Sequence, residues 1–291
     1  MRAAIHKSSI PDYQLFTIKF LEAQHFDPSW HSHSEYQLFV PLEGTGTRFI
    51  GDSIKNFTPN ELILIGSNLP HLWRSDEAYF EKNSGLKISG IVIYLQENFL
   101  GSHLMEKNEM IQLKNFFNKS SRGLEFHGKV RVTVIEMMKE LLKLNGLKAF
   151  IHLLQILNEL AITKDYNFIS HNEYIDAFKK DEADRMNHVY EYILKNYRNK
   201  IHLNEVADLV CMTPTSFSRY FAAANNKGFS KFITEIRIKN ACKLLTETEM
   251  SIATIAERTG FKTLSNFNKH FKDEMKKKPT DYKKEFLRIL S

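Results

Sequence analysis

The chain has 291 residues, of which 43% are hydrophobic and 25% are charged, and this composition predicts one large or two ordinary globular domains. Only two cysteines occur, Cys211 and Cys242, which excludes a disulfide framework and favours a reducing compartment. No secretory signal is seen near the beginning, and no run approaches about 18 uninterrupted apolar residues. We therefore expect a cytoplasmic protein with no membrane partner.

The charge is distributed unevenly. Residues 185–291 hold 20 Lys and Arg against 11 Asp and Glu, whereas the preceding residues hold 20 against 23. A basic end behind a slightly acidic front is typical of a nucleic-acid-binding module. A basic solvated surface without a partner explains the charge alone equally well.

Residues 1–96 show short apolar or alternating runs that are separated by clusters of glycine, proline and asparagine. The runs that predict strands include 36–40, 47–50, 62–65 and 88–95. Regular short strands of this kind indicate an antiparallel sandwich or barrel, and we favour a barrel.

The apolar spacing becomes helical in residues 97–163, with three- and four-residue steps from Val130 to Leu142 and from Phe150 to Ala161. These residues are predicted to form a helical extension that covers the barrel or pairs with a second subunit. Residues 164–184 are polar and weakly periodic, which predicts a linker. Residues 185–291 are predicted to be all-helical.

An internal repeat lies in this last part. Residues 203, 206 and 207 recur 49 residues later as Ile252, Ile255 and Ala256, and residues 217, 219 and 221 recur 50 residues later as Phe267, Lys269 and Phe271. Each copy predicts a short helix, a turn and a second helix, over about 203–224 and 252–275. The turns fall at 211–212 and 260–261, and Thr213 and Thr263 are the expected caps of the second helices.

The second helix of each copy has a polar face that carries short hydroxyl or amide side chains beside a cation. Such side chains suit base edges and phosphates in a major groove. The residues predicted to bind DNA are Thr215, Ser216, Ser218, Arg219, Ser265, Asn268 and Lys269. The apolar-periodic stretch 232–245 predicts one long helix between the copies, which would let one chain enter two successive grooves about 34 Å apart.

The stretch 185–288 resembles the DNA-binding domain of the AraC/XylS family of bacterial regulators. The resemblance lies in LNEVADLVCMTPTSFSRYF, RIKNACKLL and SIATIAERTGFKTLSNFNKHF. It implies base contacts at Thr215, Ser218 and Arg219 and at Ser265, Asn268 and Lys269. Lys269 departs from the usual arginine and loses its bidentate fork. Asn226 and Lys276 replace the usual glycines that end these helices, and lysine is expected to tolerate the left-handed conformation less well than asparagine.

The front also resembles a cupin barrel, through His31, His33, Gln37, Gly44 and the later His71. A metal-binding cupin gathers three histidines and a carboxylate, and here Gln37 takes the carboxylate position. Glu35, on the same face of the strand, is a second candidate. The three histidines are therefore metal-ligand candidates, but we favour an effector pocket without metal or cofactor. Its predicted lining is Trp30, His31, His33, Gln37, His71 and Trp73.

Together these features predict an α+β multidomain chain: an antiparallel cupin-like β-barrel with a helical extension, and a C-terminal all-α tandem helix-turn-helix domain. The predicted function is that of a homodimeric transcription activator rather than an enzyme. Its expected partners are promoter DNA, RNA polymerase and a small-molecule effector such as a sugar or another carbon source. The alternative is a metal-dependent cupin enzyme with a helical C-terminal domain.

Overall fold

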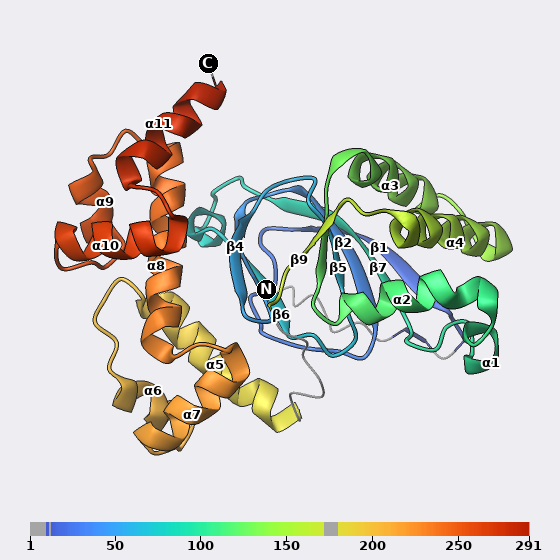
Figure 1. The fold of residues 1–291 in the computed structure, drawn as a ribbon, viewed down its shortest axis with the longest axis horizontal. Coiled ribbons are helices and arrows are strands. Elements are labelled where there is room, and N and C mark those ends of the chain that lie inside the picture. Colours follow the sequence, from blue (N-terminus) through green and yellow to red (C-terminus); the bar gives the residue numbers. More distant parts are fainter. Residues whose placement is uncertain (1–9, 12, 172–179, 291) are drawn as a thin grey trace. The chain divides into compact units, whose positions relative to one another are not determined.

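The computed structural model describes residues 10–11, 13–171 and 180–290 (Figure 1). The chain divides into two units, one of residues 1–53 and 57–183 and the other of residues 54–56 and 184–291. Residues 172–179 of the predicted linker lie outside the described residues. None of the helices in the described ranges is long and apolar enough to cross a membrane.

The strands form two sheets. A six-stranded sheet has the order β1-β7-β2-β5-β8-β9, and a three-stranded sheet has the order β4-β3-β6. The bounds are β1 Phe16–Ala23, β2 Tyr36–Glu43, β3 Gly46–Ile50, β4 Ser53–Phe57, β5 Leu62–Ile65, β6 His71–Ser75, β7 Ile88–Leu95, β8 Leu124–Phe126 and β9 Tyr166–Phe168. The four predicted strands are confirmed, and so is the antiparallel front unit, whose strands form two sheets and not one closed barrel. The strands separate because β2 pairs with β5 and β7, whereas β3 pairs with β6.

The inner strands β2, β5 and β7 of the six-stranded sheet are buried on both faces, which explains their nearly continuous apolar sequences. Leu38 and Ile93 belong to a core that includes residues of the helices, whereas the adjacent Phe39 and Val92 belong to a core that includes Trp73 of the second sheet. Because successive side chains of a strand point to opposite faces, one strand supplies both cores.

Helices α2 (Ile111–Ser120), α3 (Gly128–Leu141) and α4 (Gly146–Ile162) confirm the predicted helical extension and supply the first of these cores (Figure 1). Shorter helices are η1 (Glu77–Phe80), α1 (Ser102–Met105) and η2 (Asn108–Met110).

The extension is not purely helical, because β8 lies within it, and β9 lies within the predicted linker. Each of these strands has three residues, which is too short for a two-residue period to show in the sequence.

The second unit is helical, as predicted. Its helices are α5 (Lys180–Asn196), α6 (Leu203–Leu209), α7 (Pro214–Asn225), α8 (Phe229–Glu247), α9 (Ile252–Arg258), α10 (Leu264–Met275) and α11 (Pro279–Leu290). The pairs α6–α7 and α9–α10 are the two helix-turn-helix units, and α8 is the predicted connecting helix. The first half of α8 packs Phe229 and Phe232 against Phe221 of α7. Its second half packs Ala241 and Leu245 into the core of α9 and α10.

Candidate nucleic-acid interface and candidate effector pocket

The two helix-turn-helix units close their turns in the same way. The Met212 N–H donates to the Ala207 carbonyl at 3.0 Å, and the Phe261 N–H donates to the Ala256 carbonyl at 2.9 Å. Both alanines are buried. A larger side chain at either position would force the two helices of that unit apart, so the repeated alanine has a packing cause.

Each turn contains one residue with a positive φ, but the two residues differ in type. Cys211 has φ 54° in the first unit and Gly260 has φ 88° in the second. A Cβ at Gly260 would lie 2.6 Å from the carbonyl oxygen of Arg198 and 2.9 Å from its Cα. The glycine therefore permits both the turn and a close backbone approach.

The second helices, α7 and α10, begin at the predicted caps. The Thr213 hydroxyl accepts from the Ser216 N–H at 3.2 Å, and the Thr263 hydroxyl accepts from the Asn266 N–H at 3.2 Å. Pro214 follows the first cap and has no N–H to leave unsatisfied. Both recognition helices thus start at fixed residues, which sets the direction in which their side chains project.

The buried and exposed faces of α7 and α10 also repeat. Phe217, Phe221, Phe267 and Phe271 are fully buried. The residues predicted to bind DNA lie on the other face, where Ser218 is half-buried and the other six are exposed: Thr215, Ser216, Arg219, Ser265, Asn268 and Lys269. This placement leaves the seven side chains accessible, and their contacts with bases remain a prediction.

Both recognition helices end in a left-handed residue, Asn226 with φ 52° and Lys276 with φ 58°. Lysine therefore adopts the conformation that was expected to suit it poorly. Its N–H donates to the Lys272 carbonyl at 2.9 Å, and its ammonium donates to the Asp273 carbonyl at 2.7 Å. These bonds satisfy carbonyls that the end of a helix leaves without partners, and so they offset part of the strain.

Arg237 of α8 is an important residue that the sequence interpretation missed. Its Nε and Nη2 donate to the Tyr197 and Asn199 carbonyls, each at 2.7 Å, and its guanidinium lies 5.9 Å from the centre of the Phe261 ring. Burial lowers the pKa of Arg237 from its usual value. The side chain thus fixes the loop before α6 beside the turn of the second unit; we call this contact region, residues 197–201 with 260–262, the joint.

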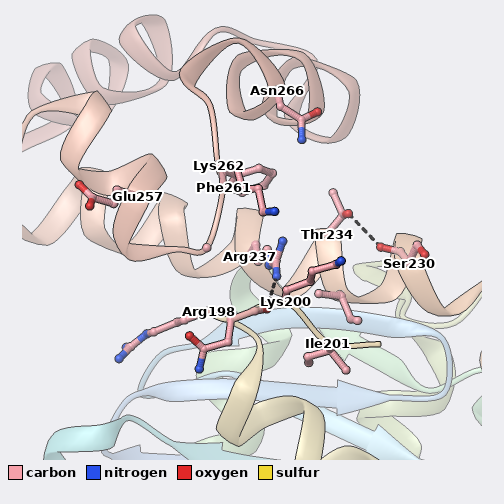
Figure 2. A pocket seen from close by; sticks show the side chains of 13 residues that line it. Arg198, Lys200, Ile201, Ser230, Thr234, Arg237, Glu257, Phe261, Lys262 and Asn266 are labelled. Atoms are coloured by element: carbon pink, nitrogen blue, oxygen red, sulfur yellow. Dashed lines mark hydrogen bonds between the residues drawn. The ribbon is translucent and has the colours of Figure 1, made fainter. Parts of the chain in front are cut away.

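A cavity of about 520 Å³ opens at the joint (Figure 2). Lys200 and Lys262 line it with exposed cationic side chains, and Ser230, Thr234 and Asn266 add polar groups. Three exposed cations, Arg198, Lys200 and Lys262, outnumber the one exposed carboxylate of the lining, Glu257, so this surface suits an anion such as a phosphate. The sequence carried no clear signal for this surface, because its residues come from four separate segments.

In the front unit, the structure brings the predicted pocket residues together. Gln37 Oε1 lies 3.0 Å from His33 Nε2 and 3.2 Å from His71 Nε2. The His31 and His71 rings are 4.4 Å apart, and the Trp73 ring lies 5.7 Å from that of His71. We call residues 31, 33, 37 and 71 the histidine cluster. Trp30, the sixth predicted residue, is buried and directly precedes it.

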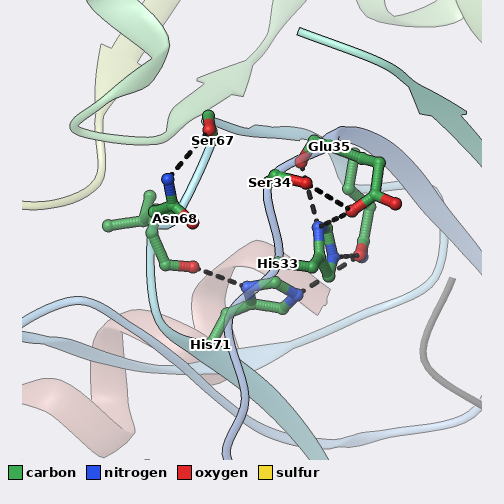
Figure 3. Close-up of polar contacts among 8 residues, drawn as sticks. His33, Ser34, Glu35, Ser67, Asn68 and His71 are labelled. Atoms are coloured by element: carbon green, nitrogen blue, oxygen red, sulfur yellow. Dashed lines mark hydrogen bonds and ion pairs between the residues drawn. The ribbon is translucent and has the colours of Figure 1, made fainter. Parts of the chain in front are cut away.

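The two candidates for the cupin carboxylate position have different places. Gln37 faces the inner nitrogens of His33 and His71, as described above. Glu35 instead lies on the outer side of His33, where its Oε2 is 3.4 Å from Nδ1 (Figure 3). Glu35 is therefore an outer partner of His33, and Gln37 is the residue inside the cluster.

Burial and the neighbouring groups affect two further side chains of this pocket. Burial, followed by the charges of His31 and His33, holds the pKa of His71 well below its usual value. Tyr94 of β7, which the sequence interpretation missed, is cross-strand to Gln37, and its ring is 5.5 Å from that of His33. Burial, with a smaller effect from Glu35, raises the pKa of Tyr94 to about 12. The signal for Tyr94 is the strand register, which the sequence alone does not give.

The chain is similar to several known proteins. Residues 206–285 match the family described as "Helix-turn-helix domain". An HTH-type transcriptional regulator of Haemophilus influenzae is 29% identical over 100 residues, which cover 34% of this chain and 34% of that protein. The Msm operon regulatory protein of Streptococcus mutans is 21% identical over 253 residues, which cover 86% and 84%. The structure of ToxT from Vibrio cholerae aligns over 93% of this chain and 98% of its own, with 16% identity and a TM-score of 0.36.

The chain thus spans about a third of the Haemophilus regulator and most of the Streptococcus regulator. These relatives are described as regulators, and they give no support to the alternative of a metal-dependent cupin enzyme. The matched residues contain almost all of both helix-turn-helix units. The chain therefore contains a helix-turn-helix domain over residues 206–285, and it is similar to proteins that are described as transcriptional regulators.

Proposed function

We propose that the chain is a sequence-specific transcription activator that binds promoter DNA through both helix-turn-helix units and responds to a small molecule in its front unit. The observation that carries this proposal is the pair of capped helices, α7 and α10. Their phenylalanines are buried, whereas Arg219, Lys269 and most of the short polar side chains of the opposite face are exposed. The excess of 20 basic over 11 acidic residues in 185–291 favours association with phosphates.

The connecting helix supports simultaneous binding in two grooves. α8 has 19 residues and is therefore about 28 Å long, which is comparable to the roughly 34 Å of one turn of DNA. Each half of α8 is buried against a different helix-turn-helix unit, and the joint adds a second connection. A rigid separation of this kind costs little ordering entropy on binding.

The joint is also the proposed contact for the DNA backbone between the two grooves. Lys200 and Lys262 are exposed there, and Asn266 lies in the first turn of α10. Cations and a helix N-terminus both favour phosphate. These residues would add affinity without sequence preference, because phosphates are the same in every sequence.

We propose unequal roles for the two recognition helices. Arg219 can bind guanine through its bidentate fork, whereas Lys269 offers only a point charge. Arg219→Ala is expected to weaken cognate DNA binding by about 1–3 kcal/mol and to reduce the preference for cognate over random DNA. Lys269→Ala should weaken binding to both DNAs similarly and reduce the salt dependence.

The test first selects the genomic fragments that the wild-type chain binds. Gel-shift titrations then measure the affinity of each variant for one selected fragment and for random DNA. Lys195→Ala is a matched control, because Lys195 is an exposed lysine of α5 and belongs to neither recognition helix. Unchanged cognate affinity of Arg219→Ala would refute its role in base recognition. Equal loss of discrimination from both variants would refute the division of roles.

The effector proposal is supported by the pocket lining. The Trp73 Nε1–H is buried and has no hydrogen-bond partner within the described part of the chain. A buried donor without a partner costs about 1–3 kcal/mol, and an acceptor on a small polar molecule such as a sugar would remove this cost. Thermal-shift screening of carbon sources tests this directly, and stabilisation by none of them would count against the sugar class.

We further propose that the regulator is a homodimer in the cytoplasm and that it contacts RNA polymerase. The dimer proposal is supported by α4, where Leu147, Ile151 and Ile162 share one face and are each at least half exposed. Sedimentation equilibrium of the full chain measures the oligomeric state. The cytoplasm and the polymerase contact follow from activation of a bacterial promoter, because the relatives named above are bacterial regulators.

A further inference from the structure

The cavity at the joint is larger than contact with a DNA backbone requires. Its volume of about 520 Å³ lies within the range of about 300–1,000 Å³ that is typical of pockets for small molecules. DNA is a stiff rod whose phosphates lie on its outside, so its backbone would touch the rim of a concave surface without filling it. The joint therefore has room for a second kind of ligand.

Two ammonium groups determine the charge of this cavity. Lys200 comes from the loop before α6, Lys262 comes from the turn between α9 and α10, and both are exposed. Among the residues that the structure describes, neither ammonium has a hydrogen-bond or ion-pair partner. Figure 2 shows both side chains in the same part of the cavity, whereas the carboxylate of Glu257 points away from them. Like charges repel each other, so an anion bound to both lysines would lower their free energy.

The rest of the lining combines polar and apolar groups. Ser230 and Asn266 are exposed there, and the Thr234 hydroxyl donates to the Ser230 carbonyl at 2.9 Å, which leaves its oxygen free to accept (Figure 2). Ile201 is half-buried and adds an apolar surface. The hydroxyl and amide groups can bind hydroxyls of a ligand, and the isoleucine can pack against its carbon atoms. This mixture suits an organic molecule that carries the anionic group, rather than an inorganic ion alone.

The number of charges distinguishes two kinds of phosphate. A phosphate of the DNA backbone is a diester with a single negative charge. A phosphomonoester carries a charge of about −1.5 to −2 at pH 7, because its second ionisation occurs near pH 6. Two unpaired lysines match the monoester more closely than the diester. We propose that the joint binds a small organic phosphomonoester, such as a sugar phosphate, through Lys200 and Lys262.

Binding of a monoester at the joint would regulate the binding of DNA. This consequence rests on the proposed function, in which Lys200 and Lys262 contact the DNA backbone. An ammonium that is bound to a monoester cannot also neutralise a backbone phosphate, so the ligand and DNA compete, and each lowers the apparent affinity for the other. The joint is then a second control site, which lies in the DNA-binding unit and is separate from the effector pocket of the front unit.

The first experiment is titration calorimetry of the purified full chain with inorganic phosphate, glucose 6-phosphate, glucose and dimethyl phosphate. We compare the wild type with a double variant, Lys200→Ala with Lys262→Ala. Glucose 6-phosphate should bind at one equivalent per chain that the double variant loses, and inorganic phosphate should bind the same site more weakly. Dimethyl phosphate is a diester and should bind more weakly still. Any binding of glucose in the front unit should be the same in both proteins.

The matched control removes the same charge elsewhere in the unit. Lys195→Ala with Lys231→Ala replaces two exposed lysines that do not line the cavity, so it should bind glucose 6-phosphate like the wild type. The proposal is overturned if neither phosphate compound binds the wild type, or if the variant without Lys200 and Lys262 binds them equally well. Equal affinity for dimethyl phosphate and glucose 6-phosphate would overturn the assignment to monoesters.

The second experiment measures competition in gel shifts on a selected fragment, with glucose 6-phosphate or with NaCl at the same ionic strength. Saturating glucose 6-phosphate should weaken DNA binding of the wild type to the level of the double variant at the joint and should leave that variant unchanged. Unchanged DNA affinity of the wild type would refute the competition. A chain that binds glucose 6-phosphate at the joint but selects no DNA would contradict the proposed function and leave this site standing, whereas a chain that binds cognate DNA but no monoester would overturn this proposal alone.

Discussion

Replacement of Gly260 by alanine should destabilise the DNA-binding unit although residue 260 itself is not on a recognition helix. At φ 88° an alanine is strained by about 1–2 kcal/mol. Its Cβ would also lie 2.6–2.9 Å from three backbone atoms of Arg198, so the backbone at Arg198 must move away from residue 260. Overpacking of this kind costs about 1–3 kcal/mol, so the expected total is about 2–5 kcal/mol. Since native domains are stable by about 5–15 kcal/mol, this loss is large.

The assay is thermal and urea unfolding of the full chain, with gel shifts at a temperature where the variant is still folded. At several degrees per kcal/mol, the unfolding temperature of the unit should fall by about 10 °C or more. DNA binding should weaken as well, because the displaced loop no longer holds the two recognition helices at a fixed separation.

Gly228→Ala is the matched control in the same unit. Gly228 has a negative φ of −68°, and a Cβ there would meet nothing within 4 Å. Its stability should change by no more than about 0.5 kcal/mol. If Gly260→Ala behaved like this control, the close contact of Gly260 with Arg198 would be wrong, and so would the role of the joint.

Two further predictions concern the ends of the recognition helices and the two cysteines. Lys276→Gly should stabilise the chain by about 1 kcal/mol, because glycine has no strain at φ 58°. Asn226→Gly should change the stability less, because asparagine tolerates this conformation better than lysine. If Lys276→Gly lowered the stability in urea unfolding, the hydrogen bonds of the lysine would outweigh its strain. Ellman's reagent at pH 8 should modify the exposed Cys211 but not the buried Cys242. Burial raises the pKa of the Cys242 thiol to about 11, so about one part in a thousand of it is thiolate at this pH. Two fast-reacting thiols in the native protein would contradict this prediction.

The sequence was sufficient for the helix-turn-helix units because their signals are local. The caps Thr213 and Thr263 act three residues away, and the buried phenylalanines recur within one helix. Even there, the local signals do not fix which apolar residue is buried at the end of α6. Leu209 is 44% exposed, whereas Val210, just after the helix, is buried.

The joint and the full pocket could not be predicted, because their contacts join residues that are distant in the sequence. Arg237 binds carbonyls 38 and 40 residues before it, and these positions become available only when the loop before α6 has folded. Tyr94 reaches the histidine cluster through the pairing of β2 with β7. A shift of one residue in that pairing would turn Tyr94 to the other face, and no local pattern fixes the register.

The connecting helix α8 makes this regulator more tolerant of substitution than of insertion. A changed side chain alters packing at one place, but one residue added to α8 turns everything after it by about 100° and moves it by about 1.5 Å. α10 would then face a different side of the DNA while both helix-turn-helix units stayed intact. Divergence of such regulators should therefore preserve the number of residues in α8 more strictly than their identity, so that helix length acts as a measure of promoter spacing.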